Sequence, residues 1–250
     1  MAIMGFKQFI TEAGASAERQ ENGFVKLIKD TVKANKGNAI TVKSQDDTVK
    51  NVVDAEKYTG RQAKGSEPYT DVQLILKNGK KVNLSMKGPS APSLAGGGLR
   101  GIEEIIPGIG YRFYDAAYKN HKKKKLKDGN KVPDTYGKLN DADKNLLVIG
   151  NIAMGGPIDF MYIGPMDVSG DFKNGVLEVN GKLIGAKKYA DEHDLYFRLR
   201  ARREDQVFDS KAKYPNGTPK IYSRSPSKGD SAGRIVVTDK PAGNRDQIVF

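Results

Sequence analysis

The segment TDVQLILKNGKKVNLSMKG (residues 70–88) constrains the fold more than any other part of the sequence. Two alternating runs flank an Asn-Gly pair, which is typical of a β-hairpin turn. A two-residue loop would set Val72 opposite Ser85, an apolar residue against a polar one. A three-residue Lys-Asn-Gly loop with Gly79 in the left-handed conformation instead pairs Val72 with Leu84. We therefore predict the longer loop, because it keeps apolar residues together on one face.

This register brings polar side chains together at one end of the hairpin. Asp71 comes opposite Ser85, and Lys87 lies diagonally beyond Ser85 on the same face. Metal-dependent phosphodiester hydrolysis needs carboxylates to hold Mg²⁺ and a cation to help activate water or stabilise negative charge. Asp71 and Lys87 are therefore candidates for such a site. The alternative is an acid in a turn beside a solvated sheet face.

The rest of the chain indicates a mixture of helices and strands. We expect helices over 6–12 and 17–34, and the second should turn an apolar stripe of Phe24, Leu27, Ile28 and Thr31 toward a sheet. Strands are expected over 38–45 and 50–59, and a helix after Gly110. From about residue 158, short strands and turns indicate a β-rich C-terminal half. We divide the chain into a leader or helix (1–16), a core (17–150) and a β-rich C-terminal region (151–250) that is separate or extends the same domain.

Charge and composition narrow the classes of function. The chain has 42 Lys and Arg against 30 Asp and Glu, a net charge of +12, which favours a polyanionic partner such as nucleic acid. A solubilising surface or a patch beside a membrane is the alternative. Zero cysteines exclude thiolate metal sites, and His121 and His193 lie in charged segments that we expect to be exposed, so a metal should have oxygen ligands. No apolar run approaches the roughly 18 residues of a membrane span. With no secretory signal pattern either, we expect a cytoplasmic protein without membrane contact.

Two basic clusters are candidates for contacting phosphates. One cluster lies in an expected loop or helix end, and the other alternates along an expected strand with its arginines on one face. The residues are Lys122, Lys123, Lys124, Lys125 and Lys127 in the first cluster, and Arg198, Arg200, Arg202 and Arg203 in the second. The alternative for the arginines is an exposed edge strand that charge protects from aggregation.

The residues around Asp71 and Lys87 also resemble a known protein family. The run Pro68-Tyr69-Thr70-Asp71, thirteen further residues and Ser85-Met86-Lys87-Gly88, preceded by a helix with Glu21, resembles the core of the PD-(D/E)XK (restriction-endonuclease-like) nucleases. The resemblance covers roughly residues 18 to 90. It implies an α+β or α/β fold with a mixed sheet flanked by helices. It also implies that Asp71 binds metal, that Lys87 is the catalytic cation and that Glu21, or alternatively Glu18, is the helix acid. The backbone carbonyl of Met86 would be a further metal ligand.

Ser85 departs from the usual pattern, because it stands where the family has a second acid. A hydroxyl is a poor Mg²⁺ ligand, so Glu21, Glu67 or a water molecule would have to complete the site. Some restriction-enzyme branches carry Ser-Leu-Lys at this place, and NLSMKG resembles them. The implied activity is a Mg²⁺- or Mn²⁺-dependent endonuclease that cuts double-stranded DNA, often as a homodimer. A non-enzymatic basic DNA-binding or phage head-associated protein is the alternative.

The opening FKQFITEAG resembles the capsid-targeting leader of internal head proteins in large tailed phages. A maturation protease cleaves such leaders after Ile/Leu-x-Glu, which would be after Glu12. The resemblance implies a phage protein that acts in the host cytoplasm or is packaged in the virion head. An ordinary amphipathic first helix would show the same residues.

Overall fold

The computed structural model describes residues 4–60, 68–89, 98–127, 129–200, 206–223, 234–239 and 246–250. Helices combine with sheets that contain both parallel and antiparallel pairs, which confirms the expected mixed α and β class and its β-rich C-terminal part. The chain forms two compact units. Unit 1 comprises 1–92 and 149–189, and unit 2 comprises 93–148 and 190–250. None of the helices in the described ranges is both long enough and apolar enough to cross a membrane.

These units differ from the division that the sequence suggested. Residues 151–189 belong with the N-terminal part of the chain, because β6 (Phe160–Ile163) pairs with β4 (Lys81–Lys87) and β8 (Val176–Val179) pairs with β1 (Ile40–Lys43). Both pairings are parallel and join residues far apart in the sequence. Local sequence patterns do not predict such long-range pairings. For this reason the boundary expected at residue 150 differs from the observed one.

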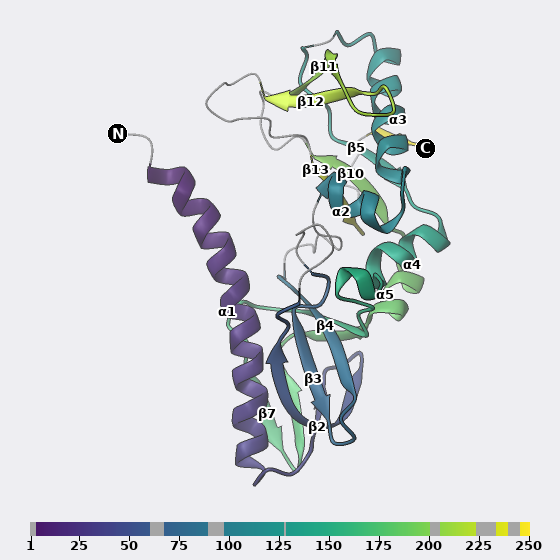
Figure 1. The fold of residues 1–250 in the computed structure, drawn as a ribbon. Helices are drawn as coiled ribbons and strands as arrows, with labels where there is room; N and C mark the ends of the chain where they lie inside the picture. The colour runs from purple at the N-terminus through teal and green to yellow at the C-terminus, as the bar shows by residue number, and fades with distance from the viewer. Residues whose placement is uncertain are drawn as a thin grey trace. The chain divides into compact units, whose positions relative to one another are not determined.

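Unit 1 consists of a long helix and an eight-stranded sheet (Figure 1). The strand order is β7-β8-β1-β2-β3-β4-β6-β9. Besides β1, β4, β6 and β8, its elements are α1 (Met4–Ala34), β2 (Thr48–Lys57), β3 (Val72–Leu76), the 3₁₀ turn η2 (Ile152–Met154), β7 (Gly170–Lys173) and β9 (Lys182–Gly185).

Helix α1 is continuous, so the two separate helices expected over 6–12 and 17–34 were wrong. The intervening segment 13–16, AGAS, contains two alanines, which are strong helix formers, and the helix runs through it. The expected apolar stripe is confirmed: Phe24 and Ile28 are fully buried, and the Phe24 ring meets Tyr162 of β6 edge-on at 5.2 Å. The core of unit 1 lies where α1 packs along the sheet (Figure 1).

The predicted hairpin register is confirmed. Val72 pairs with Leu84 and Leu74 with Val82, and all four side chains are buried. The loop has three residues, and Gly79 takes a φ of 80°, the left-handed region that favours glycine. The hairpin therefore forms with the apolar face that its own sequence specifies.

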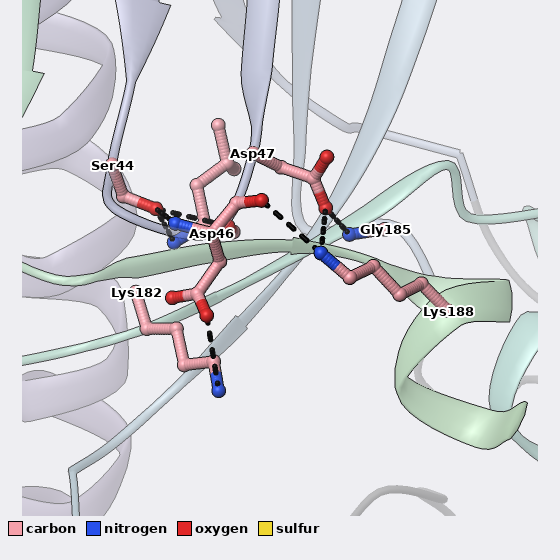
Figure 2. Close-up of polar contacts among 7 residues, drawn as sticks. Ser44, Asp46, Asp47, Lys182, Gly185 and Lys188 are labelled. Carbon is pink, nitrogen blue, oxygen red and sulfur yellow. Dashed lines mark hydrogen bonds and ion pairs between the residues drawn. The ribbon is translucent and has the colours of Figure 1, made fainter. Parts of the chain in front are cut away.

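The turn between β1 and β2 ties together distant parts of the sheet (Figure 2). The Ser44 hydroxyl accepts a bond from the Leu183 N–H at 2.9 Å and donates to the Leu183 carbonyl at 3.0 Å. Asp47 accepts from the Gly185 N–H at 2.9 Å and lies 3.8 Å from the Lys188 ammonium. Since Leu183 belongs to the edge strand β9, the sheet must curl to bring these residues together.

Unit 2 combines helices with a four-stranded sheet, order β13-β10-β5-β14, and a two-stranded hairpin, β11-β12. Its elements are α2 (Gly98–Ile105), α3 (Ile109–Lys123), β5 (Thr135–Lys138), α4 (Asp141–Ile149), β10 (Tyr196–Arg200), β11 (Gln206–Lys213), β12 (Pro219–Ser223), β13 (Arg234–Thr238) and β14 (Asp246–Ile248), with α5 (Ala186–Glu192) at the boundary between the units. The expected helix after Gly110 is α3, which begins at Ile109. His121 at its end is fully buried beside Phe208, so the expectation that this histidine is exposed was wrong.

Candidate active site

A cleft in unit 1 brings together the acid, lysine and helix positions that the sequence singled out. It has a volume of about 640 Å³ and lies where α1 passes the ends of β2 and β4 and the start of β3. Its lining residues are Ala17, Glu18, Glu21, Lys57, Tyr58, Thr59, Gly60, Pro68, Thr70, Asp71, Met86 and Lys87. Glu21, Asp71, Met86 and Lys87 therefore share one cleft. Glu67 and residues 61–66 lie outside the described residues.

Asp71 is held on several sides. Its N–H donates to the Leu84 carbonyl at 2.9 Å, and its carbonyl accepts from the Tyr58 N–H at 2.9 Å. Its carboxylate Oδ2 accepts from the Met86 N–H at 2.6 Å and from the Ser85 hydroxyl at 3.1 Å. The carboxylate is thus positioned by β4, the partner strand that the hairpin register predicted.

Ser85 supports Asp71 instead of lining the cleft. Its side chain is 2% exposed and its hydroxyl donates to the Asp71 carboxylate. A carboxylate at this place would sit against Asp71 and repel it, whereas the hydroxyl orients the Asp71 carboxylate. The placement gives Ser85 a positioning role, not that of a metal ligand.

Glu21 contributes a carboxylate from the helix side of the cleft. Its Oε2 lies 2.9 Å from the Lys57 ammonium, and its side chain is only 16% exposed. Burial raises the pKa of Glu21 above its ordinary 4.5, the hydrogen bond from Lys57 opposes this, and the nearby charge of Asp71 raises the pKa further. Glu21 and Asp71 both line the cleft. Glu18, the alternative acid, is more exposed and lies 3.7 Å from Lys57.

Gln20 anchors α1 at the cleft. Its amide nitrogen lies 3.1 Å from the Lys87 carbonyl, 2.9 Å from that of Gly164 and 3.2 Å from that of Pro165. The side chain is 2% exposed, so these contacts replace water at a buried amide. Because Gln20 precedes Glu21, the same contacts fix the helix acid relative to the end of β4.

Lys87 and Met86 line the cleft from β4. In a strand the N–H and C=O of one residue point to the same edge, so the Met86 carbonyl is directed to the side on which its N–H meets Asp71. The cleft holds three carboxylates, from Glu18, Glu21 and Asp71, and two ammonium groups, from Lys57 and Lys87. A phosphate would therefore enter more favourably with a cation bound beside the acids.

The donor set fits a hard divalent ion of the Mg²⁺ type. Such ions are bound by one or two carboxylates, with water and substrate phosphate supplying the other ligands, and Glu21 and Asp71 provide the carboxylates. Among the described residues, no group of three His, Cys, Asp or Glu side chains could hold a metal by itself. The Lys57 ammonium stands at one oxygen of Glu21, so an ion at that oxygen would have to displace it.

The basic clusters belong to unit 2. Lys122 and Lys123 end α3, and Lys124, Lys125 and Lys127 follow it, all exposed, as the expected helix end and loop.

The arginine cluster differs from its expectation. Arg198 pairs with Asp134 at 2.9 Å and is 29% exposed, so its charge is largely satisfied inside the unit. Its strand, β10, lies between β13 and β5, which rules out the edge-strand alternative. The side chain of Arg200 and all of Arg202 and Arg203 lie outside the described residues.

Sequence reasoning missed Lys57, which lines the cleft, and Gln20, which anchors α1 beside it. Gln20 carries a usable signal, because it lies four residues before Phe24 on the buried stripe of α1, where a polar residue requires a partner. Lys57 carries no such signal. It faces Val72 only through the pairing of β2 with β3, which the sequence did not predict.

Comparison of this chain with protein-family models, with curated proteins and with solved structures finds no match. The function must therefore be inferred from the cleft and its residues.

Proposed function

We propose that this protein is a Mg²⁺- or Mn²⁺-dependent nuclease that hydrolyses phosphodiester bonds of DNA in the cleft of unit 1. The observation that carries the proposal is the convergence of Glu21, Asp71 and Lys87, from a helix and two strands, on a single cleft. The arrangement agrees with the resemblance to the PD-(D/E)XK nucleases, including the Ser-x-Lys variant.

Each residue has a defined task in this proposal. Glu21 and Asp71 would hold the ion, with the Met86 carbonyl as a further oxygen, and Ser85 keeps the Asp71 carboxylate in place. When bound, the ion supplies Lewis-acid stabilisation of the phosphate and lowers the pKa of water. Lys87 contributes a positive charge that stabilises the negative charge developing on the phosphate.

The test is cleavage of supercoiled plasmid with Mg²⁺ or Mn²⁺. We expect nicking or linearisation that EDTA stops and that Asp71→Ala and Lys87→Ala abolish. Asp171→Ala is the matched control, since Asp171 is an exposed acid of unit 1 in β7 and does not line the cleft. Intact plasmid with both metals, or full activity of both cleft variants, would refute the proposal.

A non-enzymatic DNA-binding protein is the second candidate. Two observations favour it: Ser85 replaces an acid, and Lys57 already neutralises Glu21. It predicts salt-sensitive DNA binding that Asp71→Ala and Lys87→Ala leave unchanged in a gel-shift series, with no cleavage. The leader-like FKQFITEAG adds packaging in a phage head to this candidate, and mass spectrometry of virion protein would then find a chain beginning after Glu12.

A further inference from the structure

The hairpin β11–β12 adds lysines to the basic end of α3. Segments 119–131 and 211–220 contain ten lysines and one aspartate, in a chain whose net charge is +12. We define the basic face by these lysines: Lys119, Lys122, Lys123, Lys124, Lys125, Lys127, Lys131, Lys211, Lys213 and Lys220. All ten are exposed, and Lys119 pairs with Asp115 at 2.6 Å. Much of the positive charge of the protein is therefore displayed by two segments that lie some eighty residues apart in the sequence.

Contacts within unit 2 hold the two segments together. The Gly129 N–H donates to the Phe208 carbonyl at 3.3 Å, and Lys131 forms an isolated bridge with Val207. The Tyr214 ring stacks on Tyr114 at 5.3 Å with an interplanar angle of 4°. The hairpin lies beside α3 in Figure 1, as these contacts require. The two segments that carry these lysines therefore lie against each other within unit 2.

The chemistry of the basic face points to a phosphate backbone. A dense group of lysines binds a polyanion by releasing its counterions, without reading sequence. The four exposed large apolar residues in the described part of unit 1 and unit 2 are Leu146, Ile152, Phe172 and Val249, and all lie outside the basic face. A membrane surface would therefore meet charge here, but no apolar side chain to insert.

The aromatic rings of this region distinguish duplex from single-stranded nucleic acid. Proteins that bind single strands offer aromatic faces on which bases stack. Here the rings cover each other: Tyr214 lies against Tyr111 and Tyr114, and Tyr118 lies against Phe208. The Lys220 ammonium lies 5.9 Å above the Tyr214 ring. The rings therefore hold the hairpin on α3, and the surface that remains suits an intact double helix.

We propose that the basic face of unit 2 binds the phosphate backbone of double-stranded DNA, with β11–β12 and the end of α3 contributing together. This site is distinct from the cleft and rests on the proposed function only for the choice of DNA as the polyanion. It would retain the protein on DNA whether or not the cleft is hydrolytic.

The test measures binding of the full chain to a fluorescent 30-base-pair duplex by anisotropy in EDTA, which prevents metal-dependent cleavage. We expect Lys213→Glu/Lys220→Glu and, separately, Lys123→Glu/Lys127→Glu each to weaken binding about tenfold. The neutral pair Lys213→Gln/Lys220→Gln should lower the slope of log K against log salt by about 2. This neutral variant keeps the test valid if charge reversal disturbs folding.

The matched control is Lys77→Glu/Lys80→Glu, at the exposed tip of the β3–β4 hairpin in unit 1. It makes the same charge change and should alter binding less than twofold. The inference is overturned if control and test variants weaken binding equally, or if single-stranded DNA, duplex RNA or anionic vesicles bind more tightly than the duplex. Because cleavage plays no part, these results are separate from the fate of the nuclease proposal: DNA binding without cleavage would refute only the latter.

Discussion

Two hairpins of this protein, β3–β4 and β11–β12, have turns of the same type but differ in their proposed roles. In β3–β4 the Leu76 N–H bonds to the Lys80 carbonyl at 2.9 Å, and in β11–β12 the Tyr214 N–H bonds to the Thr218 carbonyl at 2.8 Å. In each turn an Asn-Gly pair supplies a left-handed glycine, Gly79 or Gly217. The local chemistry of the two turns is therefore the same.

The two hairpins differ in the interactions that fix their register and hold them in the fold. The register of β3–β4 follows from its own apolar alternation, and that register delivers Asp71 to Ser85. In β11–β12 the register shifts between Asp209 and Lys213, and the hairpin is held on α3 by ring contacts. A turn motif therefore predicts a hairpin, whereas the role of that hairpin depends on the elements against which its strands pack.

The largest expected effect is that a variant next to β3–β4 changes the rate of cleavage, whereas a variant in β11–β12 changes the binding of DNA. If the proposed nuclease activity holds, Asp71→Asn should lower the cleavage rate by about a hundredfold or more and leave duplex affinity unchanged, because it would weaken only the proposed metal site. Lys213→Gln/Lys220→Gln should raise KM and leave kcat unchanged. Steady-state cleavage of a labelled duplex, with anisotropy for affinity, measures both. A fall in kcat for the lysine variant would mean that the hairpins do not divide these tasks.

A smaller effect concerns the way in which each hairpin is held. Tyr214→Leu removes the stacked and tilted ring contacts to Tyr114 and Tyr111, each pair contributing about 1 kcal/mol. Amides of β11–β12 should then exchange hydrogen faster, while those of β3–β4 stay protected. Hydrogen exchange followed by mass spectrometry reports both. Unchanged exchange in β11–β12 would show that the rings do not hold it.

A further expected effect concerns Lys57, at the end of β2, and the pKa of the neighbouring Glu21. Its hydrogen bond and charge both lower the pKa of Glu21, so Lys57→Met should raise that pKa further. Because metal binding needs the deprotonated carboxylate, the acidic limb of the cleavage profile should move to higher pH at low Mg²⁺. Lys43→Met, which breaks an ion pair with Glu178 outside the cleft, is the control. A shift to lower pH would contradict the assignment.

The smallest effect should be equal in the two hairpins. Gly79→Ala and Gly217→Ala each place a side chain at φ near 80°, where an added Cβ meets no atom within 4 Å. The cost is then conformational alone, about 1 kcal/mol in each case. Urea unfolding followed by hydrogen exchange in each unit compares the two costs. A cost several times larger at one glycine would contradict a purely conformational cost at that turn.

Some of the candidate site was predictable because the information is local. The pairing of Val72 with Leu84 depends on residues within one hairpin, and it places Asp71, Ser85 and Lys87 without reference to the rest of the chain. Glu21 was predictable from the resemblance. By the same logic the second Asn-Gly pair, Asn216-Gly217, was a hairpin signal that the sequence analysis did not use.

Other features depended on contacts between distant segments. Lys57 reaches Glu21 only because α1 packs on β2, and Gln20 finds its three carbonyl partners only where α1 meets the ends of β4 and β6. The alternation along the strand predicts an exposed Arg198, whereas in the structure Arg198 pairs with Asp134. Each case needed a partner that periodicity along the chain does not name.

The sequence by itself determined the turns, the alternation within the predicted hairpin and the surplus of positive charge, because these depend on neighbouring residues and on composition. The tertiary structure decided which strands share a sheet, which charges are neutralised and which basic segments lie together. The physical reason is that burial and electrostatic pairing act between side chains close in space, and long-range strand pairing sets that closeness.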